Sequence, residues 1–380
     1  MKKILVWADS PTCPTGFGNV VKNIINNFPE NTYEFVVYGI NHTDDKHDLN
    51  CRIYKTKAGH DMYGYTGIQK ILKKERPDIL FLINDIWIIQ EMLKHVKQSV
   101  STVVYFPIDA EDHDPEWYSC LDRVNRAVVY NDFGWRVASK ARPDINYSII
   151  EHGVDNKVFY RQFDSRKEAK RELFRAPKLH DSFIILNAGR NQPRKRLDIT
   201  LRAFAEFSKD KQDVFIYMHS GIKDSHIDTV RLARELGIED RLILTTQEPG
   251  IPNLHSSDLN FLYNACDVGI NTGVGEGFGL PNAEHAATGA VQIVPDHSAL
   301  TDLYKDCGIL VPANTLFTLD NISTTAKMVA VQDVVKALEL VYDNRELYDK
   351  HSKLCYEKFN SEKYSWKNIA GQWFELFNEL

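Results

Sequence analysis

The stretch CDVGINTGVGEGFGLPNAEHAATG (266–289) joins an apolar run to a turn of small residues and then to a short helical segment. CDVGINTG (266–273) predicts a buried strand, and VGEGFG (274–279) predicts the turn that follows it. Pro281 suits the first position of a helix, and Gly289 suits its end. A strand, a glycine-rich turn and a helix in this order are typical of an open parallel α/β sheet.

Similar apolar runs alternate with helical-period segments along the chain, which predicts βαβ units and parallel sheets. The first series of runs is ILVWA (4–8), EFVVYGI (34–40), DILFLIN (78–84), STVVYF (101–106) and RAVVY (126–130). The second series is FIILNAG (183–189), VFIYMHS (214–220), RLILTT (241–246), CDVGINT (266–272), VQIVP (291–295) and GILVP (308–312). The fold class expected from two such series is α/β, with two tandem Rossmann-like, doubly wound domains.

The length of 380 residues, of which 43% are hydrophobic, also favours two domains over one. We expect the join near residue 160, because an apolar segment gives way there to the charged helix DSRKEAKRELFRAPK (164–178). The expected domains are therefore an N-terminal one over 1–160 and a C-terminal one over 161–362. Open parallel sheets bind ligands at the carboxyl ends of their strands, so the two domains are expected to face a central cleft.

The last segment, 363–380, has more apolar side chains at helical spacing than a solitary helix would expose. We expect it to form a helix that packs back on the N-terminal domain. The apolar residues are Trp366, Ile369, Trp373, Leu376 and Phe377.

Charge and cysteine content exclude several classes of protein. The net charge of -6 is spread evenly, so neither half is a basic nucleic-acid module. The six cysteines lie far apart without a C-x-x-C pair, which argues against a zinc site and a disulfide framework. The first apolar run ends at Asp9, and no apolar run reaches about 18 residues, so we expect a soluble cytoplasmic protein without stable membrane insertion.

Two acids flank the glycine turn. The free N–H groups at the start of the following helix favour an anion, with phosphate the first candidate. Glu276 lies in the loop and Glu284 about one turn into the helix, so both can face the same ligand. Carboxylates accept hydrogen bonds from vicinal hydroxyls. The alternatives are that both acids are solvated and that the turn only joins a strand to a helix.

GEGFGLPNAEHAATG (275–289) resembles the E-x7-E signature of family 4 glycosyltransferases, which are retaining enzymes of the two-Rossmann-domain GT-B fold. The resemblance covers essentially the whole chain. Within the family, the sequence is most similar to compact members from large DNA viruses and phages, and a viral protein of this kind would be located in the host cytoplasm. The other segments that carry the resemblance are YNACDVGINTGVGEGFGL (263–280), NAGRNQPRKRLDITLRAFAEF (187–207), the interdomain strand EHGVDNKVF (151–159) and PTGFGN (14–19).

The resemblance implies a role for each matching residue of the donor side. Glu284 would bind the nucleotide ribose, and Glu276 hydroxyls of the donor sugar. The cations Arg190 and Lys195 would bind the donor diphosphate, whose charge grows as the sugar–phosphate bond breaks. The remaining donor-binding residues are Gly277, Phe278, Gly279 and Leu280 beside Glu276, with Gly16 and Gly18 in the N-terminal domain. A solvated loop is the alternative for GRNQPRK (189–195).

Two further positions match the family on the acceptor side. Asp109 resembles the acid or histidine that many relatives place beside the acceptor, where it could orient or deprotonate a hydroxyl. A helix-capping aspartate is the alternative. His152 matches a position near the hinge, although a histidine beside a glycine also serves as a local hydrogen-bonding residue. DHD (112–114) lies off the donor domain, so no metal is assigned.

A dehydrogenase interpretation competes for the loop around Gly16 and Gly18. The loop lacks a third glycine, and the second strand is followed by Asn41 and His42 rather than by an acid for a ribose. No cofactor is therefore expected, and the nucleoside-diphosphate sugar is a co-substrate.

The expected function is transfer of a hexosyl or pentosyl group from a UDP- or GDP-sugar to an acceptor hydroxyl with retention of configuration. The acceptor could be a glycan, a protein, a lipid or a modified DNA base. The basic segment IQKILKKERP (68–77) could touch a membrane or a nucleic acid, or be a solvated helix face. The alternative functions are a sugar-nucleotide epimerase or hydrolase on the same fold and a catalytically silent nucleotide-sugar binding subunit.

Overall fold

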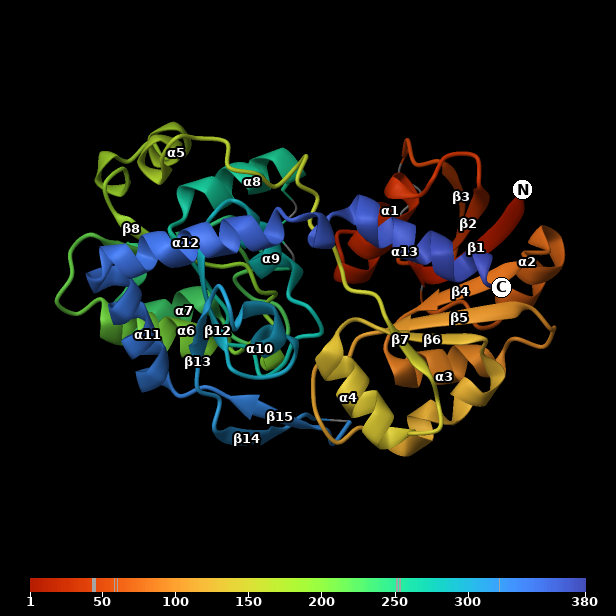
Figure 1. Ribbon diagram of the computed structural model, residues 1–380. Coiled ribbons are helices and arrows are strands. Elements are labelled where there is room, and N and C mark those ends of the chain that lie inside the picture. Colours follow the sequence, from red (N-terminus) through yellow and green to blue (C-terminus); the bar gives the residue numbers. More distant parts are fainter. Residues whose placement is uncertain (43–45, 58, 60, 251, 253, 321) are drawn as a thin grey trace. The chain divides into compact units, whose positions relative to one another are not determined.

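The computed structural model describes residues 1–42, 46–57, 59, 61–250, 252, 254–320 and 322–380 (Figure 1). The chain divides into two units. The first unit consists of residues 1–153 and 362–380, and the second unit consists of residues 154–361.

The join follows Gly153, whereas the sequence places it near residue 160. The difference arises because the intervening segment is hydrogen-bonded into the second unit. The amide of Tyr160 donates to Asn260 Oδ1 at 3.1 Å, and Asn156 Nδ2 donates to the carbonyl of Phe359 at 3.1 Å. These side-chain bonds give no periodic signal in the sequence.

The first unit is built on a sheet of seven parallel strands in the order β3-β2-β1-β4-β5-β6-β7. Strands β1 and β4 lie side by side although they are separated in sequence, so the strand order reverses between them. The strands are β1 (Lys2–Asp9), β2 (Tyr33–Ile40), β3 (Cys51–Lys55), β4 (Ile79–Ile83), β5 (Ser101–Phe106), β6 (Arg126–Val129) and β7 (Tyr147–Ile149).

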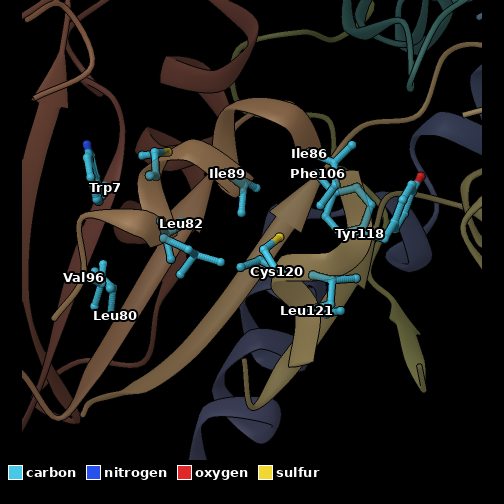
Figure 2. Close-up of a cluster of buried hydrophobic side chains, with 14 of the residues drawn as sticks. Trp7, Leu80, Leu82, Ile86, Ile89, Val96, Phe106, Tyr118, Cys120 and Leu121 are labelled. Atoms are coloured by element: carbon cyan, nitrogen blue, oxygen red, sulfur yellow. The ribbon is translucent and has the colours of Figure 1, made fainter. Parts of the chain in front are cut away.

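Helices cover the strands of the first unit, and their apolar faces form its core. Figure 2 shows Leu80 and Leu82 of β4 in one buried cluster with Ile86 and Ile89 of the helix that follows it, all four with no exposed surface. The helices of this unit are α1 (Gly16–Asn27), α2 (Ile68–Glu75), α3 (Ile86–Lys94), η1 (Pro115–Arg123), α4 (Asp132–Ala141), η5 (Glu362–Tyr364) and α13 (Trp366–Asn378).

The C-terminal helix α13 packs against residues of β4 that point away from Leu80 and Leu82, on the other face of the sheet. It lies beside α1 in Figure 1, and the ring of Trp373 lies 4.7 Å from that of Phe81 on β4. Phe377 packs 5.3 Å from the same ring. Trp373 and Phe377 are fully buried, so the aromatic face of α13 forms a core of the first unit on this second face of its sheet.

The second unit repeats the architecture with six parallel strands in the order β10-β9-β8-β11-β12-β13. An antiparallel hairpin, β14–β15, follows the sheet. The strands are β8 (Phe183–Asn187), β9 (Val214–Met218), β10 (Leu242–Leu244), β11 (Val268–Ile270), β12 (Val291–Pro295), β13 (Ile309–Val311), β14 (Thr315–Thr318) and β15 (Thr325–Met328). The helices are α5 (Arg166–Leu173), η2 (Pro177–Leu179), η3 (Pro193–Lys195), α6 (Leu197–Phe207), α7 (Thr229–Glu235), η4 (Glu239–Arg241), α8 (Ser256–Ala265), α9 (Leu280–Ala287), α10 (Ala299–Tyr304), α11 (Val331–Asp343) and α12 (Arg345–Phe359).

The predicted pair of Rossmann-like sheets is confirmed, because each apolar run of both series contains a strand. Four strands are missing from the prediction, namely β3, β7, β14 and β15. The segment 151–159, which the resemblance gives as a strand, follows β7 and lies outside the named strands.

The basic segment 68–77 contains helix α2. Its apolar residues Ile68 and Leu72 are buried in the first core, while Lys70, Lys73 and Lys74 are exposed. The arrangement is that of a helix with a core face and a solvated basic face.

Candidate functional site

The site is organised by two asparagines at the carboxyl ends of neighbouring parallel strands of the second unit. Strands β8 and β11 pair where the strand order reverses, which is where sheets of this kind bind ligands. Asn187 ends β8, and its Oδ1 accepts a hydrogen bond from the amide of Gly189 at 2.8 Å. Asn271 follows β11, and its Oδ1 accepts from the amide of Gly273 at 2.8 Å. Each asparagine therefore shapes the turn that leaves its strand.

Glu276 lies at the centre of this region, and it is 5% exposed. Lys195 Nζ donates to its Oε1, and Asn271 Nδ2 donates to the same oxygen at 3.1 Å. Arg194 donates to Oε2 at 3.4 Å and to the carbonyl of Gly275 at 2.9 Å. The loop that carries the two cations and the loop that carries the acid are thus joined by charge-assisted hydrogen bonds.

These cations keep Glu276 ionised. Burial by itself raises the pKa of the carboxyl, but the charges of Lys195 and Arg194 outweigh it and lower the pKa to about 2. A buried carboxylate with two cationic partners can accept hydrogen bonds from a ligand only with its remaining lone pairs. A small pocket opens at this point, lined by Asn187, Gly189, Lys195, Ile270, Asn271, Glu276, Pro281 and Asn282.

Glu284 belongs to a different group of contacts. It is half-buried on α9, and Tyr263 donates to its Oε2 at 3.4 Å. Burial raises the pKa of Glu284 to about 8, the bond from Tyr263 opposes the rise, and the negative charge of Asp155 adds to it. The two glutamates are therefore held in opposite electrostatic environments, although they lie on one strand–turn–helix unit.

Arg190 makes a separate ion pair. Its Nε donates to Asp224 Oδ2 at 2.8 Å, and 45% of its side chain is exposed. The structure therefore brings Lys195 together with Glu276, whereas Arg190 is held on the solvent side of the same loop by an acid that the sequence analysis did not assign.

The turn before α9 has the backbone geometry that its glycines allow. Gly279 has φ +82°, a left-handed conformation that side chains disfavour, and a Cβ there would lie 3.1 Å from Leu300. Phe278 is buried, while Gly277 and Leu280 are half-buried. Helix α9 begins at Leu280, so Pro281 occupies its second position, within the first turn where the missing N–H costs nothing.

The glycine loop of the first unit leads from β1 into α1. The Thr15 hydroxyl accepts from the amide of Gly18 at 3.1 Å and donates to Asp9 Oδ2 at 2.7 Å. A Cβ on Gly18 would lie 2.6 Å from the carbonyl oxygen of Cys13, so only glycine fits there. Gly16 faces open space. Gly18 therefore serves the local fold, and Gly16 is the position that leaves room beside the loop.

Asp109 follows β5 and is half-buried. Its charge acts on His113, a buried residue whose Nδ1 lies 2.9 Å from the hydroxyl of Tyr118. Burial lowers the pKa of His113 to about 4, and Asp109 opposes that shift. Asp112 of the DHD triplet instead pairs with Lys140 at 2.9 Å.

His152 is a core residue of the first unit. It is 3% exposed, its Nδ1 lies 2.9 Å from the hydroxyl of Tyr105, and its ring stacks 6.0 Å from Trp366. Burial lowers its pKa to about 3. The neighbouring Gly153 is needed for close approach, because a Cβ would lie 2.8 Å from the amide of Trp366. His152 thus helps to seat the C-terminal helix.

The described residues include neither a metal cluster nor a membrane-spanning helix. Among the residues that the structure describes, no group of three or more His, Cys, Asp or Glu side chains is placed to hold a metal ion. No helix in the described part of the chain combines the length and the apolar character needed to cross a membrane.

The chain is similar to known proteins in sequence and in structure. Residues 147–319 match the family model of glycosyl transferases group 1. The structure is similar over 100% of this chain to sucrose-phosphate synthase from Thermosynechococcus elongatus (TM-score 0.80, 16% identity, 99% of that chain). The chain has the GT-B glycosyltransferase fold. Anabaena HepE, solved with UDP and glucose, shares this GT-B fold (TM-score 0.71, 14% identity, 100% of both chains).

A curated relative is similar in sequence to much of the chain. D-inositol 3-phosphate glycosyltransferase of Mycolicibacterium smegmatis is 26% identical over 306 residues, which are 74% of this chain. The chain spans 62% of the length of that relative. The GT-B fold and the family match support the glycosyltransferase interpretation of the sequence.

Sequence reasoning missed several residues of the site. Arg194 stands beside the predicted Lys195, and Asn271 lies near the end of a predicted strand, so position alone could have indicated both. Ser298 accepts a hydrogen bond from the amide of Glu276 at 3.0 Å from a turn 22 residues away, and local sequence carries no sign of that contact.

Proposed function

We propose that the protein is a glycosyltransferase that moves a sugar from a nucleoside-diphosphate sugar to an acceptor hydroxyl. The observation that carries this proposal is the buried Glu276 carboxylate held by Lys195 and Arg194 at the carboxyl ends of β8 and β11. Breaking the sugar–phosphate bond builds negative charge on the leaving diphosphate, which fixed cations stabilise. The group 1 family match and the UDP and glucose bound by HepE support the proposal.

Each donor-side residue has a proposed partner on the nucleotide sugar. Lys195 and Arg190 bind the diphosphate, Glu276 binds hydroxyls of the sugar, and Glu284 binds the ribose. The amides of residues 277–280 at the start of α9 add donors for the sugar and phosphates. In the first unit, the proposed roles are a phosphate contact for the loop with Gly16, where a Cβ would meet open space, and orientation of the acceptor hydroxyl for Asp109 after β5.

The proposed reaction retains the configuration of the sugar. The bond between the anomeric carbon and the diphosphate oxygen breaks, and a bond to the acceptor oxygen forms on the same face. The acceptor proton passes to the leaving oxygen, so neither a carboxylate nucleophile nor a metal ion is invoked. We further propose that the donor is a UDP- or GDP-linked hexose or pentose. The proposed acceptor is a glycan, a protein, a lipid or a modified DNA base. Similarity to viral and phage members, with a cytoplasmic location, is part of the same proposal.

The test is release of nucleotide from UDP- and GDP-sugars, with and without glycan, protein, lipid or modified DNA acceptors. Acceptor-dependent release with a product of the donor's anomeric configuration by NMR is the expected result. Epimer or free sugar formed without an acceptor would instead indicate an epimerase or hydrolase. Tight binding without turnover would indicate a silent binding subunit.

A further inference from the structure

Two residues beside the Lys195–Glu276 pair have strained backbones. Arg196 has φ 49° and ψ 47°, and Ser298 has φ 57° and ψ -148°. Side chains disfavour the first conformation, and the second is almost restricted to glycine. Among the described residues of the second unit, the only other non-glycine residue with positive φ is Ser323. Strain in this unit is therefore concentrated around the pair.

The turn at Ser298 and Ala299 binds both the amide and the carbonyl of Glu276. The Ser298 hydroxyl accepts from the amide of Glu276 at 3.0 Å, and the next amide, of Ala299, donates to the carbonyl of Glu276 at 3.4 Å. Ser298 is 3% exposed, so water does not compete with these bonds. The turn after β12 therefore fixes the backbone position from which the Glu276 side chain extends.

Arg196 holds the backbone beside Lys195 in the same way. Its carbonyl accepts from the hydroxyl of Thr272 at 2.9 Å, which ties it to the residue after Asn271. Its guanidinium makes two bonds to Asp198, at 2.9 and 2.7 Å. These contacts hold Arg196 in a backbone conformation that is unfavourable for an arginine without them.

The β14–β15 hairpin supports both loops from outside. Met328 of β15 accepts from Arg196 Nη1 at 3.1 Å, and the ring of Phe317 on β14 lies 5.8 Å below the same guanidinium. The amide of Lys327 donates to the carbonyl of Val274, two residues before Glu276, at 3.3 Å. The hairpin therefore contacts the loop of the cations and the loop of the acid.

We propose that Arg196 and Ser298 are positioning residues whose strained backbones fix the Lys195–Glu276 pair for a nucleotide-sugar donor. This inference rests on the proposed function. Strained conformations persist where surrounding contacts enforce them, and they gather at ligand sites. Groups that are already in place need no reorganisation when charge develops on the leaving diphosphate, so loosening them should slow turnover more than it weakens donor binding.

The main test is Ser298→Gly, because glycine accepts this backbone conformation and lacks the hydroxyl. We expect an equal or higher melting temperature, kcat lower by about tenfold or more, and donor KM within about threefold. Ser298→Ala keeps the strain and loses the hydroxyl, so both the melting temperature and kcat should fall. The matched control is Asn31→Gly, which relieves φ 57° on an exposed turn of the first unit and should leave kcat unchanged.

Arg196 is tested by the pair Arg196→Gly and Arg196→Ala. Both lose the guanidinium, but only glycine accepts φ 49° without strain, so the alanine variant should have the lower kcat. Arg196→Gly should also weaken UDP or GDP binding by calorimetry, because Lys195 is less firmly placed.

The outcomes separate the two proposals. Turnover and nucleotide affinity within twofold of wild type in both Ser298→Gly and Arg196→Gly would overturn the inference and leave the proposed function intact. A wild type that binds UDP or GDP but transfers no sugar would overturn the proposed function, while the nucleotide affinities still test the positioning roles. A wild type that binds neither nucleotide would overturn both.

Discussion

Lys195 Nζ donates a hydrogen bond to Glu276 Oε1, so the lysine assigned to the donor diphosphate and the acid assigned to the donor sugar are partners in this structure. The lysine side chain is 14% exposed and the acid 6%. A diphosphate that approaches Lys195 must therefore share it with a buried carboxylate. Both the stability of the second unit and the proposed chemistry depend on this one contact.

Lys195→Ala should reduce both stability and turnover. Removing one partner of a buried pair leaves the other charge poorly compensated, and we expect the free energy of unfolding to fall by about 3 kcal/mol or more. Turnover should be nearly abolished, because the cation acts on charge that grows in the transition state. Urea unfolding and steady-state kinetics measure the two effects.

The double variant Lys195→Ala/Glu276→Gln is the control for this prediction. A neutral amide needs no cation, so stability should largely return while turnover does not. A single variant as stable as wild type, or with turnover within about threefold of it, would contradict the assignment.

Arg190→Ala should separate activity from stability. The Arg190 side chain is 45% exposed and that of Asp224 is 17% exposed, and ion pairs that solvent reaches contribute about 0–1 kcal/mol to folding. Loss of a charge-assisted contact to the diphosphate costs about 1.5–3 kcal/mol, so kcat/KM should fall by roughly tenfold or more. Asp224→Ala removes the same ion pair and keeps the cation, and it should not share this loss. Equal kinetics for wild type and Arg190→Ala would exclude Arg190 from the site.

The two glutamates should fail differently when they are changed. Glu284→Ala removes acceptors for the ribose, a group that donor and product share, so it should weaken binding of both. Glu276→Ala should spare binding of UDP or GDP, which lack the sugar, and reduce transfer and discrimination between donor sugars. Calorimetry beside kinetics distinguishes them, and equal loss of product affinity in both variants would refute the division of roles.

Nucleotide binding should strengthen as pH rises towards 8. The pKa of Glu284 is raised to about 8, so at pH 6 the carboxyl is protonated, and the ionised form makes the stronger hydrogen bonds to ribose hydroxyls. Calorimetry at pH 6, 7 and 8 should show rising affinity in wild type. Glu284→Gln should show a flat profile, and a wild-type profile as flat as that of the glutamine variant would argue against this role.

The same carboxyl affects folding stability in the opposite direction. Because its folded-state pKa lies above its unfolded-state value, its stabilising contribution is full below about 4.5 and is lost as pH rises through about 8. Chemical unfolding of wild type and Glu284→Gln over this range measures the difference. As pH rises, the free energy of unfolding of wild type should fall relative to that of Glu284→Gln.

Chelation should leave turnover nearly unchanged, because cationic side chains and helix amides are assigned the role that a metal ion has elsewhere. Activity is compared before and after EDTA treatment. Loss of activity with rescue by Mn²⁺ would require a metal in the mechanism.

Apolar runs in the sequence predict the central strands of both sheets but not the short strands at the edges and in the hairpin. The central strands are continuous apolar runs because both faces are covered, so the run at 101–106 matches β5 residue for residue. Edge strand β3 has only half-buried and exposed residues over Cys51–Lys55, and β7 has only three residues, so neither shows such a run. The strands β14 and β15 have four residues each, and neither contains a buried run.

In the site, the sequence likewise predicts single residues but not the contacts between distant segments. Glu276 and Lys195 could be assigned from motifs, but their direct contact links residues 81 positions apart. The strain at Ser298 is invisible in the sequence, because serine there gives no indication of a conformation that glycine usually adopts. The partner of Arg190, Asp224, is likewise brought close by the loop after β9 and not by any spacing.

The place of α13 has a consequence for the order in which the protein can fold as it is made. Phe81 and Trp373 belong to one core, yet the ribosome adds nearly 300 residues between them, including the whole of 154–361. The second unit has all its strands before the first has its last helix. Until then, the apolar surface around Phe81 stays uncovered, so the unit that begins the chain is the later of the two to reach its final form.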